Sequence, residues 1–264
     1  MKIPAPQISL KAKLSQNELT IGSWVTLGHP LIPEILAPAG FDWLVVDLEH
    51  SSIGISELLP LIISIQANAM TPLVRVGENN PNLIKRVMDA GAHGVIVANV
   101  CSGQEAEQAV KAVKYPPVGT RGVGLYRAQG FGRKFEEYKE WLAAESLVIV
   151  QIEHIEAVRN IEAIFATPGV DAFMVGPYDL SGSLGKPGAL RDPEVTQAID
   201  EIMLAARRHH LSAGFHSVSS SPAEASDRIA QGFRFLAFSV DFMFLGDMAI
   251  SALGQLRTLV KETS

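Results

Sequence analysis

The sequence of 264 residues has a single cysteine, Cys101, so no internal disulfide can form, and the chain fits a reducing compartment. It lacks the roughly 18 consecutive apolar residues that a transmembrane helix requires. Residues 1–17 include lysines but no apolar segment typical of a secretory signal. We therefore expect a cytoplasmic protein.

Clusters of basic residues are absent as well. The 22 lysines and arginines are scattered among 28 acidic residues, and the formal net charge is -6. Proteins that bind nucleic acids concentrate positive charge on one face, so we expect neither nucleic acid nor membrane as a partner. No Pro-, Gly- or Ser-rich linker divides the chain, which predicts a single domain over residues 1–264.

Short apolar runs alternate with amphipathic stretches along the whole chain. The apolar runs are typical of strands buried on both faces of a parallel sheet, and they predict strands over residues 20–27, 43–47, 71–76, 94–98, 147–152, 172–175, 212–215 and 235–239. The amphipathic stretches predict helices over residues 33–39, 55–68, 80–90, 102–114, 135–145, 155–166, 194–209 and 222–231, with a last helix through Leu256. Eight such units in about 250 residues are typical of a (β/α)8 TIM barrel. The alternative is a doubly wound open sheet, which usually has a Gly-rich first turn that is missing here.

Polar side chains stand at the carboxyl ends of most predicted strands, where the active sites of α/β barrels lie. They are His29, Asp47, Glu49, His50, Arg75, Gln151, Glu153, Asp179, His216 and Asp241. No lysine is among them, although an aldolase that works through a Schiff base needs one in its pocket. Carboxylates without a lysine indicate a divalent metal instead.

Glu153 and Asp179 are the best pair of candidate metal ligands. Two carboxylates that leave other positions to water and substrate oxygens suit Mg²⁺ or Mn²⁺ better than structural zinc. Such a metal would polarise a substrate carbonyl and hold an enolate. The alternatives are a salt bridge for Glu153 and a helix N-cap for Asp179.

His50 is the natural general base, because an imidazole accepts and returns protons near neutral pH. Arg75 follows a buried strand, so its guanidinium could stabilise developing negative charge, or it could form a buried ion pair with Asp47. Asp89 stands four residues after Lys85, and from this spacing alone a surface ion pair is the simplest interpretation.

A loop rich in glycine and proline begins at Tyr115 and extends to about Lys134. Loops of this length inside a compact domain are usually functional. We therefore expect a lid or an interface element here.

Several motifs, in this order, resemble the HpcH/HpaI family of metal-dependent pyruvate aldolases, and the resemblance runs from residue 22 to residue 246. The motifs are Gly40-Phe41-Asp42-Trp43 through Glu49-His50, Val74-Arg75-Val76, Met88-Asp89-Ala90-Gly91-Ala92, Tyr115-Pro116-Pro117 with Gly119-Thr120-Arg121-Gly122, Val150-Gln151-Ile152-Glu153 and Gly176-Pro177-Tyr178-Asp179-Leu180-Ser181. Together they are far more specific than any one motif.

The resemblance implies a (β/α)8 barrel whose C-terminal helix is exchanged between subunits of a hexamer, a trimer of dimers. It implies reversible cleavage of a 4-hydroxy-2-oxo acid into pyruvate and an aldehyde through a metal-bound enolate, with Mg²⁺ or Mn²⁺, or with Co²⁺. By the same resemblance, Glu153 and Asp179 bind the metal, His50 is the proton acceptor, and Asp89 raises the basicity of His50.

The resemblance also assigns Arg75 as the stabiliser of the transition state, and Gln151 with the backbone of Tyr178 and Asp179 as contacts of pyruvate. The chain departs from the family pattern near the expected mouth of the site. Tyr178 stands where a small residue is usual, and His216 replaces a usually apolar residue and could add a polar contact to the aldehyde. The departures therefore concern specificity more than chemistry.

Two alternatives stay open beside the aldolase. An acyl-CoA lyase resembling citrate lyase β subunits would want a basic surface for nucleotide phosphates, and the sequence shows none. A catalytically silent oligomeric binding protein would be expected to have lost a catalytic residue, whereas every position that matches the family is filled.

Overall fold

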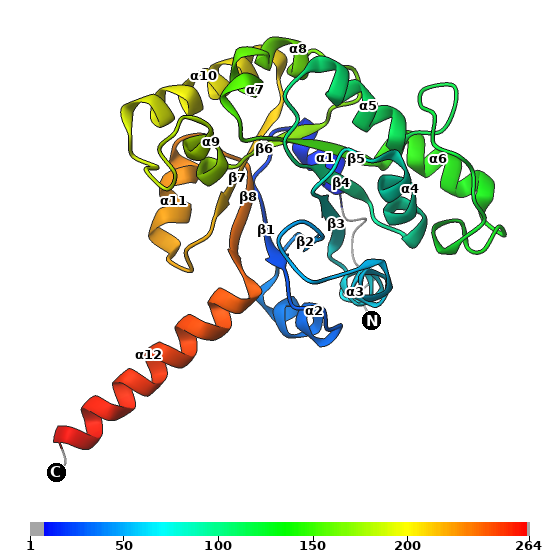
Figure 1. The fold of residues 1–264 in the computed structure, drawn as a ribbon. Coiled ribbons are helices and arrows are strands. Elements are labelled where there is room, and N and C mark those ends of the chain that lie inside the picture. Colours follow the sequence, from blue (N-terminus) through cyan, green and yellow to red (C-terminus); the bar gives the residue numbers. More distant parts are fainter. Residues whose placement is uncertain (1–7, 263–264) are drawn as a thin grey trace.

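The computed structural model describes residues 8–262, and it contains a closed barrel of eight parallel strands in the order β1 to β8 (Figure 1). The strands are β1 (Thr20–Val25), β2 (Trp43–Asp47), β3 (Thr71–Val76), β4 (Gly94–Val97), β5 (Leu147–Ile152), β6 (Ala172–Val175), β7 (Ser212–Ser217) and β8 (Phe235–Val240). The predicted (β/α)8 barrel is thus confirmed, and the open sheet is excluded because β1 pairs with β8.

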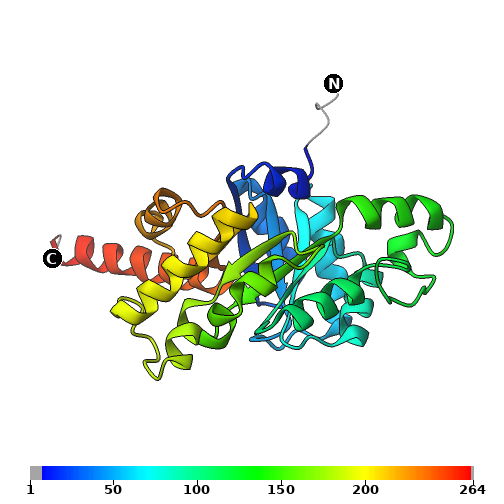
Figure 2. The same ribbon diagram turned by 90° about the horizontal axis from the view of Figure 1, so that it is seen from above.

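Helices surround the barrel (Figure 2). They are α2 (Leu31–Leu36), η1 (Ala37–Ala39), α3 (Ile55–Ala67), α4 (Pro81–Ala90), α5 (Gly103–Val113), η2 (Arg127–Gln129), α6 (Phe135–Glu145), α7 (Ile155–Arg159), α8 (Ile161–Phe165), α10 (Pro193–His209) and α11 (Pro222–Ala230). The single helix predicted over residues 155–166 is wrong in one respect, because it is divided at Asn160. This residue leaves the helical conformation, and its side-chain amide donates a hydrogen bond to the carbonyl of Cys101 (2.9 Å).

The strands are apolar on both faces because each face packs against its own cluster of side chains. One cluster fills the interior of the barrel, where the rings of Trp43 and Phe235 stack with their centroids 4.2 Å apart. The other lies between the strands and the surrounding helices. A short helix, α1 (Leu10–Ser15), buries Leu10 and Leu14 against the interior cluster. The amino end of the barrel is therefore a packed floor, and polar groups are left to the carboxyl end.

Asp241, one of the predicted polar residues at strand ends, has a structural task. Its carboxylate accepts hydrogen bonds from the backbone N–H groups of Thr26 and Leu27 (both 2.8 Å) and from the Thr26 hydroxyl (2.7 Å). The end of β8 is thereby fastened to the residues that follow β1, where the barrel closes.

Helix α12 (Asp241–Glu262) leaves the barrel after β8 and projects away from it in both views (Figure 1, Figure 2). Leu245, Met248 and Ile250 are each more than two-thirds exposed along this helix. No helix among residues 8–262 is both long and apolar enough to cross a membrane. Exchange of α12 between subunits stays a prediction.

The loop between α5 and α6 is anchored by the buried side chain of Arg121. The Arg121 guanidinium donates hydrogen bonds to the carboxylate of Asp89 and to the hydroxyl of Tyr138 (2.9 Å). Val118, Leu125 and Phe131 stay exposed on the outside of the loop. Apolar side chains held outward in this way favour an interface element over a lid.

Candidate active site

A cavity of about 260 Å³ lies where the carboxyl ends of the strands converge. Most of the predicted site residues line it, namely His50, Arg75, Gln151, Tyr178 and Asp179. They follow or end β2, β3, β5 and β6, so the barrel brings together residues that are far apart in the sequence. None of the described residues of the 115–134 loop lines this cavity, and the expectation of a lid therefore finds no support within one chain.

Arg75 is held in place by two carboxylates and a ring. Its Nε and Nη2 atoms donate hydrogen bonds to the two oxygens of Asp47 (2.9 and 2.7 Å), and Nε lies 3.1 Å from Oε2 of Glu49. The guanidinium carbon lies 4.3 Å from the centre of the Trp24 ring. Arg75 therefore forms the buried ion pair with Asp47 and also lines the cavity, and its stabilisation of developing negative charge stays a prediction.

The ionic network shifts the pKa values of its members. Burial alone would raise the pKa of Asp47, but the hydrogen bonds and charge of Arg75 hold it below its usual value. Burial would lower the pKa of Arg75, and the bond and charge of Asp47 outweigh this effect and raise it. Both groups stay charged at neutral pH, so the guanidinium is a permanent positive charge in the wall of the cavity.

Glu153 lies beside the cavity with its carboxylate almost fully buried. One oxygen accepts a hydrogen bond from the backbone N–H of Asn99 (2.6 Å), and the other accepts one from the side-chain amide of Gln151. Burial raises the pKa of Glu153, the two hydrogen bonds oppose this shift, and the nearby charges of Glu49 and Asp179 raise the pKa further. Carboxylates that repel one another in this way are stabilised by a cation between them.

Gly176 is what allows β6 to end so close to Glu153. A Cβ atom at this position would lie 2.6 Å from Oε2 of Glu153. The chain continues directly into α9 (Pro177–Ser183), a short helix outside the predicted helical ranges, which carries Asp179 in its first turn. The missing side chain therefore brings the second carboxylate into the neighbourhood of the first.

These residues fit a hard divalent cation. The carboxylates of Glu153 and Asp179 are the oxygen ligands that Mg²⁺ and Mn²⁺ prefer, and Oε1 of Gln151 is buried without a hydrogen-bond partner among the described residues. Within residues 8–262 no three His, Cys, Asp or Glu side chains form a ligand cluster. Two carboxylates and an amide oxygen would leave the other coordination positions of such a cation to water and substrate.

His50 and Asp89 are not brought together within one chain. The His50 side chain is 65% exposed, and its Nε2 atom lies 3.9 Å from Oε2 of Glu49. Asp89 is in the last turn of α4, at the end of the barrel where the strands begin, and it pairs with Arg121. The surface ion pair predicted between Asp89 and Lys85 is replaced by the ion pair between Asp89 and Arg121.

Comparisons with known proteins agree with the geometry. The family model for HpcH/HpaI aldolase/citrate lyase matches residues 20–247 of the chain. The chain belongs to this family. A 5-keto-4-deoxy-D-glucarate aldolase of Shigella dysenteriae serotype 1 (strain Sd197) is 38% identical over 253 residues, which cover 96% of this chain and 93% of that protein.

Solved structures of family members share the fold. An HpcH/HpaI aldolase/citrate lyase family protein from Burkholderia cenocepacia J2315 superposes with a TM-score of 0.90 at 34% identity, over 94% of this chain and 98% of that chain. The HpcH/HpaI aldolase from Desulfitobacterium hafniense DCB-2 gives a TM-score of 0.86 at 30% identity, over 95% and 97% of the two chains. The predicted family and the predicted class of enzyme, a carbon–carbon lyase, are confirmed, and dependence on a divalent metal is typical of this family.

The HpcH/HpaI family resemblance left two residues of the site without an assigned role. Glu49 forms an ion pair with Arg75, and burial followed by the charges of neighbouring acids raises its pKa despite Arg75 and His50. Trp24 lies inside a strand and lines the cavity with its ring. Trp24 could be predicted from its position near the end of β1, where an inward-facing side chain meets the site. Glu49 could be predicted because it is the second acidic residue at the end of β2, after Asp47.

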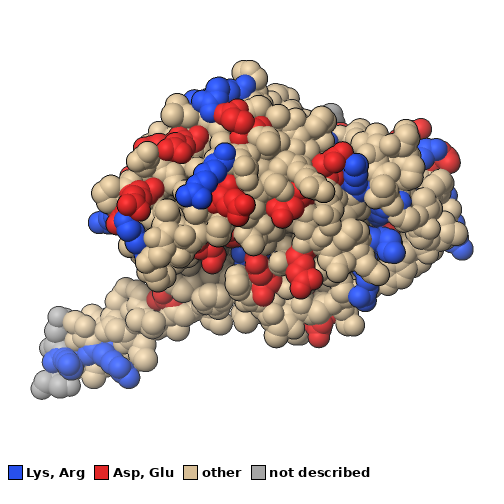
Figure 3. Space-filling model, turned by 45° about the horizontal axis from the view of Figure 1, so that its top comes forward, with Lys and Arg blue, Asp and Glu red and all other residues tan. Residues whose placement is uncertain are grey.

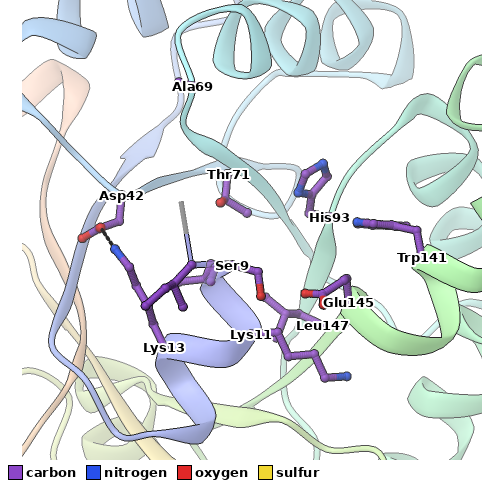
Figure 4. Close-up of a pocket in the computed structure, with 12 residues that line it drawn as sticks. Ser9, Lys11, Lys13, Asp42, Ala69, Thr71, His93, Trp141, Glu145 and Leu147 are labelled. Carbon is purple, nitrogen blue, oxygen red and sulfur yellow. Dashed lines mark hydrogen bonds and ion pairs between the residues drawn. The ribbon is translucent and has the colours of Figure 1, made fainter. Parts of the chain in front are cut away.

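A second cavity, of about 170 Å³, lies at the opposite end of the HpcH/HpaI barrel (Figure 4). Asp42, Thr71, His93 and Leu147 in its lining stand at the amino ends of strands. Lys13 points to Asp42 across this cavity and pairs with it at 2.7 Å. None of the predicted site residues lines this cavity.

Proposed function

We propose that this chain cleaves a 4-hydroxy-2-oxo acid of the 5-keto-4-deoxy-D-glucarate class into pyruvate and an aldehyde. The observation that carries the proposal is the convergence of Arg75, Gln151 and Asp179 on one cavity, with no lysine among the described residues that line it. A Schiff base cannot form without a lysine or another amine. Negative charge on the oxo acid must then be stabilised by the guanidinium and by a metal.

In this proposal Gln151 and the backbone N–H groups of Tyr178 and Asp179 bind the oxo acid end of the substrate. Both N–H groups lie in the first turn of α9, where they have no carbonyl partner within the helix. The Nη1 atom of Arg75 has no hydrogen-bond partner among the described residues, since Asp47 and Glu49 engage Nε and Nη2. It is therefore available to a substrate oxygen.

His50 takes the proton of the 4-hydroxyl group as the general base. The bond between C3 and C4 then breaks, C4 leaves as the aldehyde carbon, and the electron pair forms the enolate of pyruvate. Arg75 stabilises the negative charge on the enolate oxygen, and a proton delivered to C3 completes pyruvate. When Glu153 and Asp179 hold Mg²⁺ or Mn²⁺, or alternatively Co²⁺, the metal supplies Lewis-acid stabilisation of the same charge.

We further propose that residues 1–264 form one aldolase domain, which assembles in the cytoplasm as a homo-oligomer, with a hexamer favoured by the family resemblance. The exposed apolar side chains of α12 support exchange of this helix between subunits. Asp89 can raise the basicity of His50 only across a subunit interface, because the two residues lie at opposite ends of one barrel.

The acyl-CoA lyase receives less support than the aldolase. Basic and acidic side chains are interspersed on the face of the molecule in Figure 3, and no continuous basic patch for nucleotide phosphates is visible on that face. A small-molecule oxo acid, in contrast, needs only the charges inside the cavity.

Incubation with 5-keto-4-deoxy-D-glucarate and Mg²⁺ tests the proposal, with pyruvate detected by its methyl signal in proton NMR. We expect pyruvate and an aldehyde in equal amounts, and no product after addition of EDTA. Equal rates with and without EDTA, or no pyruvate with Mg²⁺, Mn²⁺ or Co²⁺, would contradict it.

A further inference from the structure

One polar group that lines the active-site cavity has no task in the proposed reaction. His216 is next to the last residue of β7, and its ring lies against that of Trp24 with the centroids 5.1 Å apart. Trp24 in turn contacts Arg75, as described above. His216 and Trp24 thus come from β7 and β1, whereas Gln151 and Glu153 come from the end of β5. The cavity therefore has a second side, away from the residues proposed to bind the oxo acid end of the substrate.

The hydrogen bond of His216 fixes which ring nitrogen carries the proton. Nε2 lies 3.1 Å from the backbone carbonyl oxygen of Ser239. A carbonyl only accepts, so Nε2 must donate, and Nδ1 of the neutral ring is left with its lone pair. Burial lowers the pKa of His216 to about 4, and the charge of Arg75 adds to this effect against the opposing bond to Ser239 and charge of Asp47. The ring is therefore uncharged at neutral pH.

The lone pair of Nδ1 has no donor within the part of the chain that the structure describes. His216 lines the active-site cavity, and its hydrogen bond to Ser239 uses Nε2, so Nδ1 is the ring nitrogen left for a ligand in the cavity. An uncharged acceptor that is open to a cavity selects a hydrogen-bond donor, such as a hydroxyl group, and gains nothing from a carboxylate.

We propose that Nδ1 of His216 accepts a hydrogen bond from a hydroxyl group on the aldehyde half of the substrate, and that the enzyme therefore prefers aldehydes hydroxylated next to the reacting carbon. The inference rests on the proposed function and names its substrate class more closely. Cleavage of 5-keto-4-deoxy-D-glucarate between C3 and C4 leaves an aldehyde that carries such a hydroxyl. His216 is a specificity residue in this account and takes no part in bond cleavage.

The aldol addition of pyruvate to matched aldehydes tests the inference. Glycolaldehyde carries the hydroxyl and acetaldehyde lacks it, so the ratio of their kcat/KM values measures its recognition. His216→Leu replaces the imidazole with an apolar side chain of similar size and removes the acceptor. We expect the ratio to fall roughly tenfold, mainly through a higher KM for glycolaldehyde. His216→Asn places an amide oxygen near the position of Nδ1, so this variant should retain most of the ratio.

The ratio is measured within each enzyme preparation, so a loss of folded protein cancels. An unchanged ratio in His216→Leu, or a ratio in His216→Asn as low as in the leucine variant, would overturn the inference. Exchange of pyruvate methyl protons in D2O by the wild type distinguishes a failure of the proposed function from a failure of the role of His216. If exchange is absent, the proposed function fails; if it is present and the ratio does not respond to residue 216, only the role of His216 fails.

Discussion

Arg75 balances the charge of the active site by contacting two carboxylates at once. Asp47 accepts two parallel hydrogen bonds from its guanidinium, and Glu49 pairs with the same side chain. A planar fork can serve two oxygens of one carboxylate and still present a further N–H to a substrate, which a lysine ammonium cannot do in the same geometry.

Replacing Arg75→Lys should therefore damage catalysis although the positive charge is kept. We expect kcat/KM for cleavage to fall by roughly 100-fold, because the ammonium follows Asp47 and leaves the substrate oxygen unpaired. Steady-state kinetics of pyruvate release measure this effect. Arg86→Lys, on the exposed side of α4, is the matched control and should keep wild-type activity; activity of both variants near the wild-type level would remove Arg75 from the mechanism.

Buried neutral histidines should make the protein sensitive to acid. Burial, followed by the charge of Arg127, lowers the pKa of His93 to about 4 from 6.5, against the opposing charge of Glu145. The unfolded chain thus binds a proton in this range that the folded protein does not, so stability is complete above pH 6.5 and is lost as the pH falls toward 4.

We expect His93 to contribute about 3 kcal/mol to this loss of unfolding free energy. His93→Gln should make the decline between pH 6.5 and 4.5 shallower, as measured by urea unfolding at a series of pH values. Identical slopes for the variant and the wild type would show that His93 does not carry the effect.

At the scale of elements, the strands were predictable because each is a run of apolar residues buried on both faces. Strands β2, β3, β5 and β6 have the predicted bounds. The short helices α1 and α9 escape prediction because their lengths are set by packing on the barrel floor and by the close approach at Gly176, which leave little periodic signal. Helices η1 and α4 end at Gly40 and Gly91, which adopt positive φ angles of 81° and 108°, a conformation that glycine tolerates best.

The contact between β1 and β2 depends on the absence of a side chain at Gly22. A Cβ atom there would overlap the ring of Trp43, which stacks on Phe235 in the barrel interior. Gly22→Ala should lower the free energy of unfolding by roughly 3 kcal/mol, as expected for overpacking of a core. Gly182→Ala in α9, where an added Cβ meets nothing within 4 Å, is the control for chemical denaturation; equal stabilities of the two variants would contradict this account.

At the scale of the whole molecule, the convergence of the site residues within one barrel was predictable from the sequence. Contacts between site residues of different subunits were not. Residues at strand ends meet because closure of the barrel forces the carboxyl ends together. The spacing of Asp89 carries no information on its partner, since its ion pair with Arg121 joins two distant elements and any contact with His50 requires a second chain.

The projecting helix α12 predicts self-association. Its exposed apolar side chains would be costly in a monomer and are buried if the helix packs on another subunit. We expect light scattering to give an oligomer for the wild type and a smaller species for the double variant Leu245→Glu and Met248→Glu. Gln255→Glu, an exposed polar position on the same helix, should leave the mass unchanged; a monomeric wild type would contradict helix exchange.

The central claim, formation of a pyruvate enolate with the help of Glu153 and a divalent metal, is tested most directly by exchange of pyruvate methyl protons in D2O. We expect exchange with Mg²⁺ or Mn²⁺, its loss with EDTA, and a fall of roughly 100-fold or more in Glu153→Gln. Glu156→Gln, an exposed residue just after the site, should exchange at the wild-type rate. Exchange that persists in EDTA and in Glu153→Gln would contradict the claim.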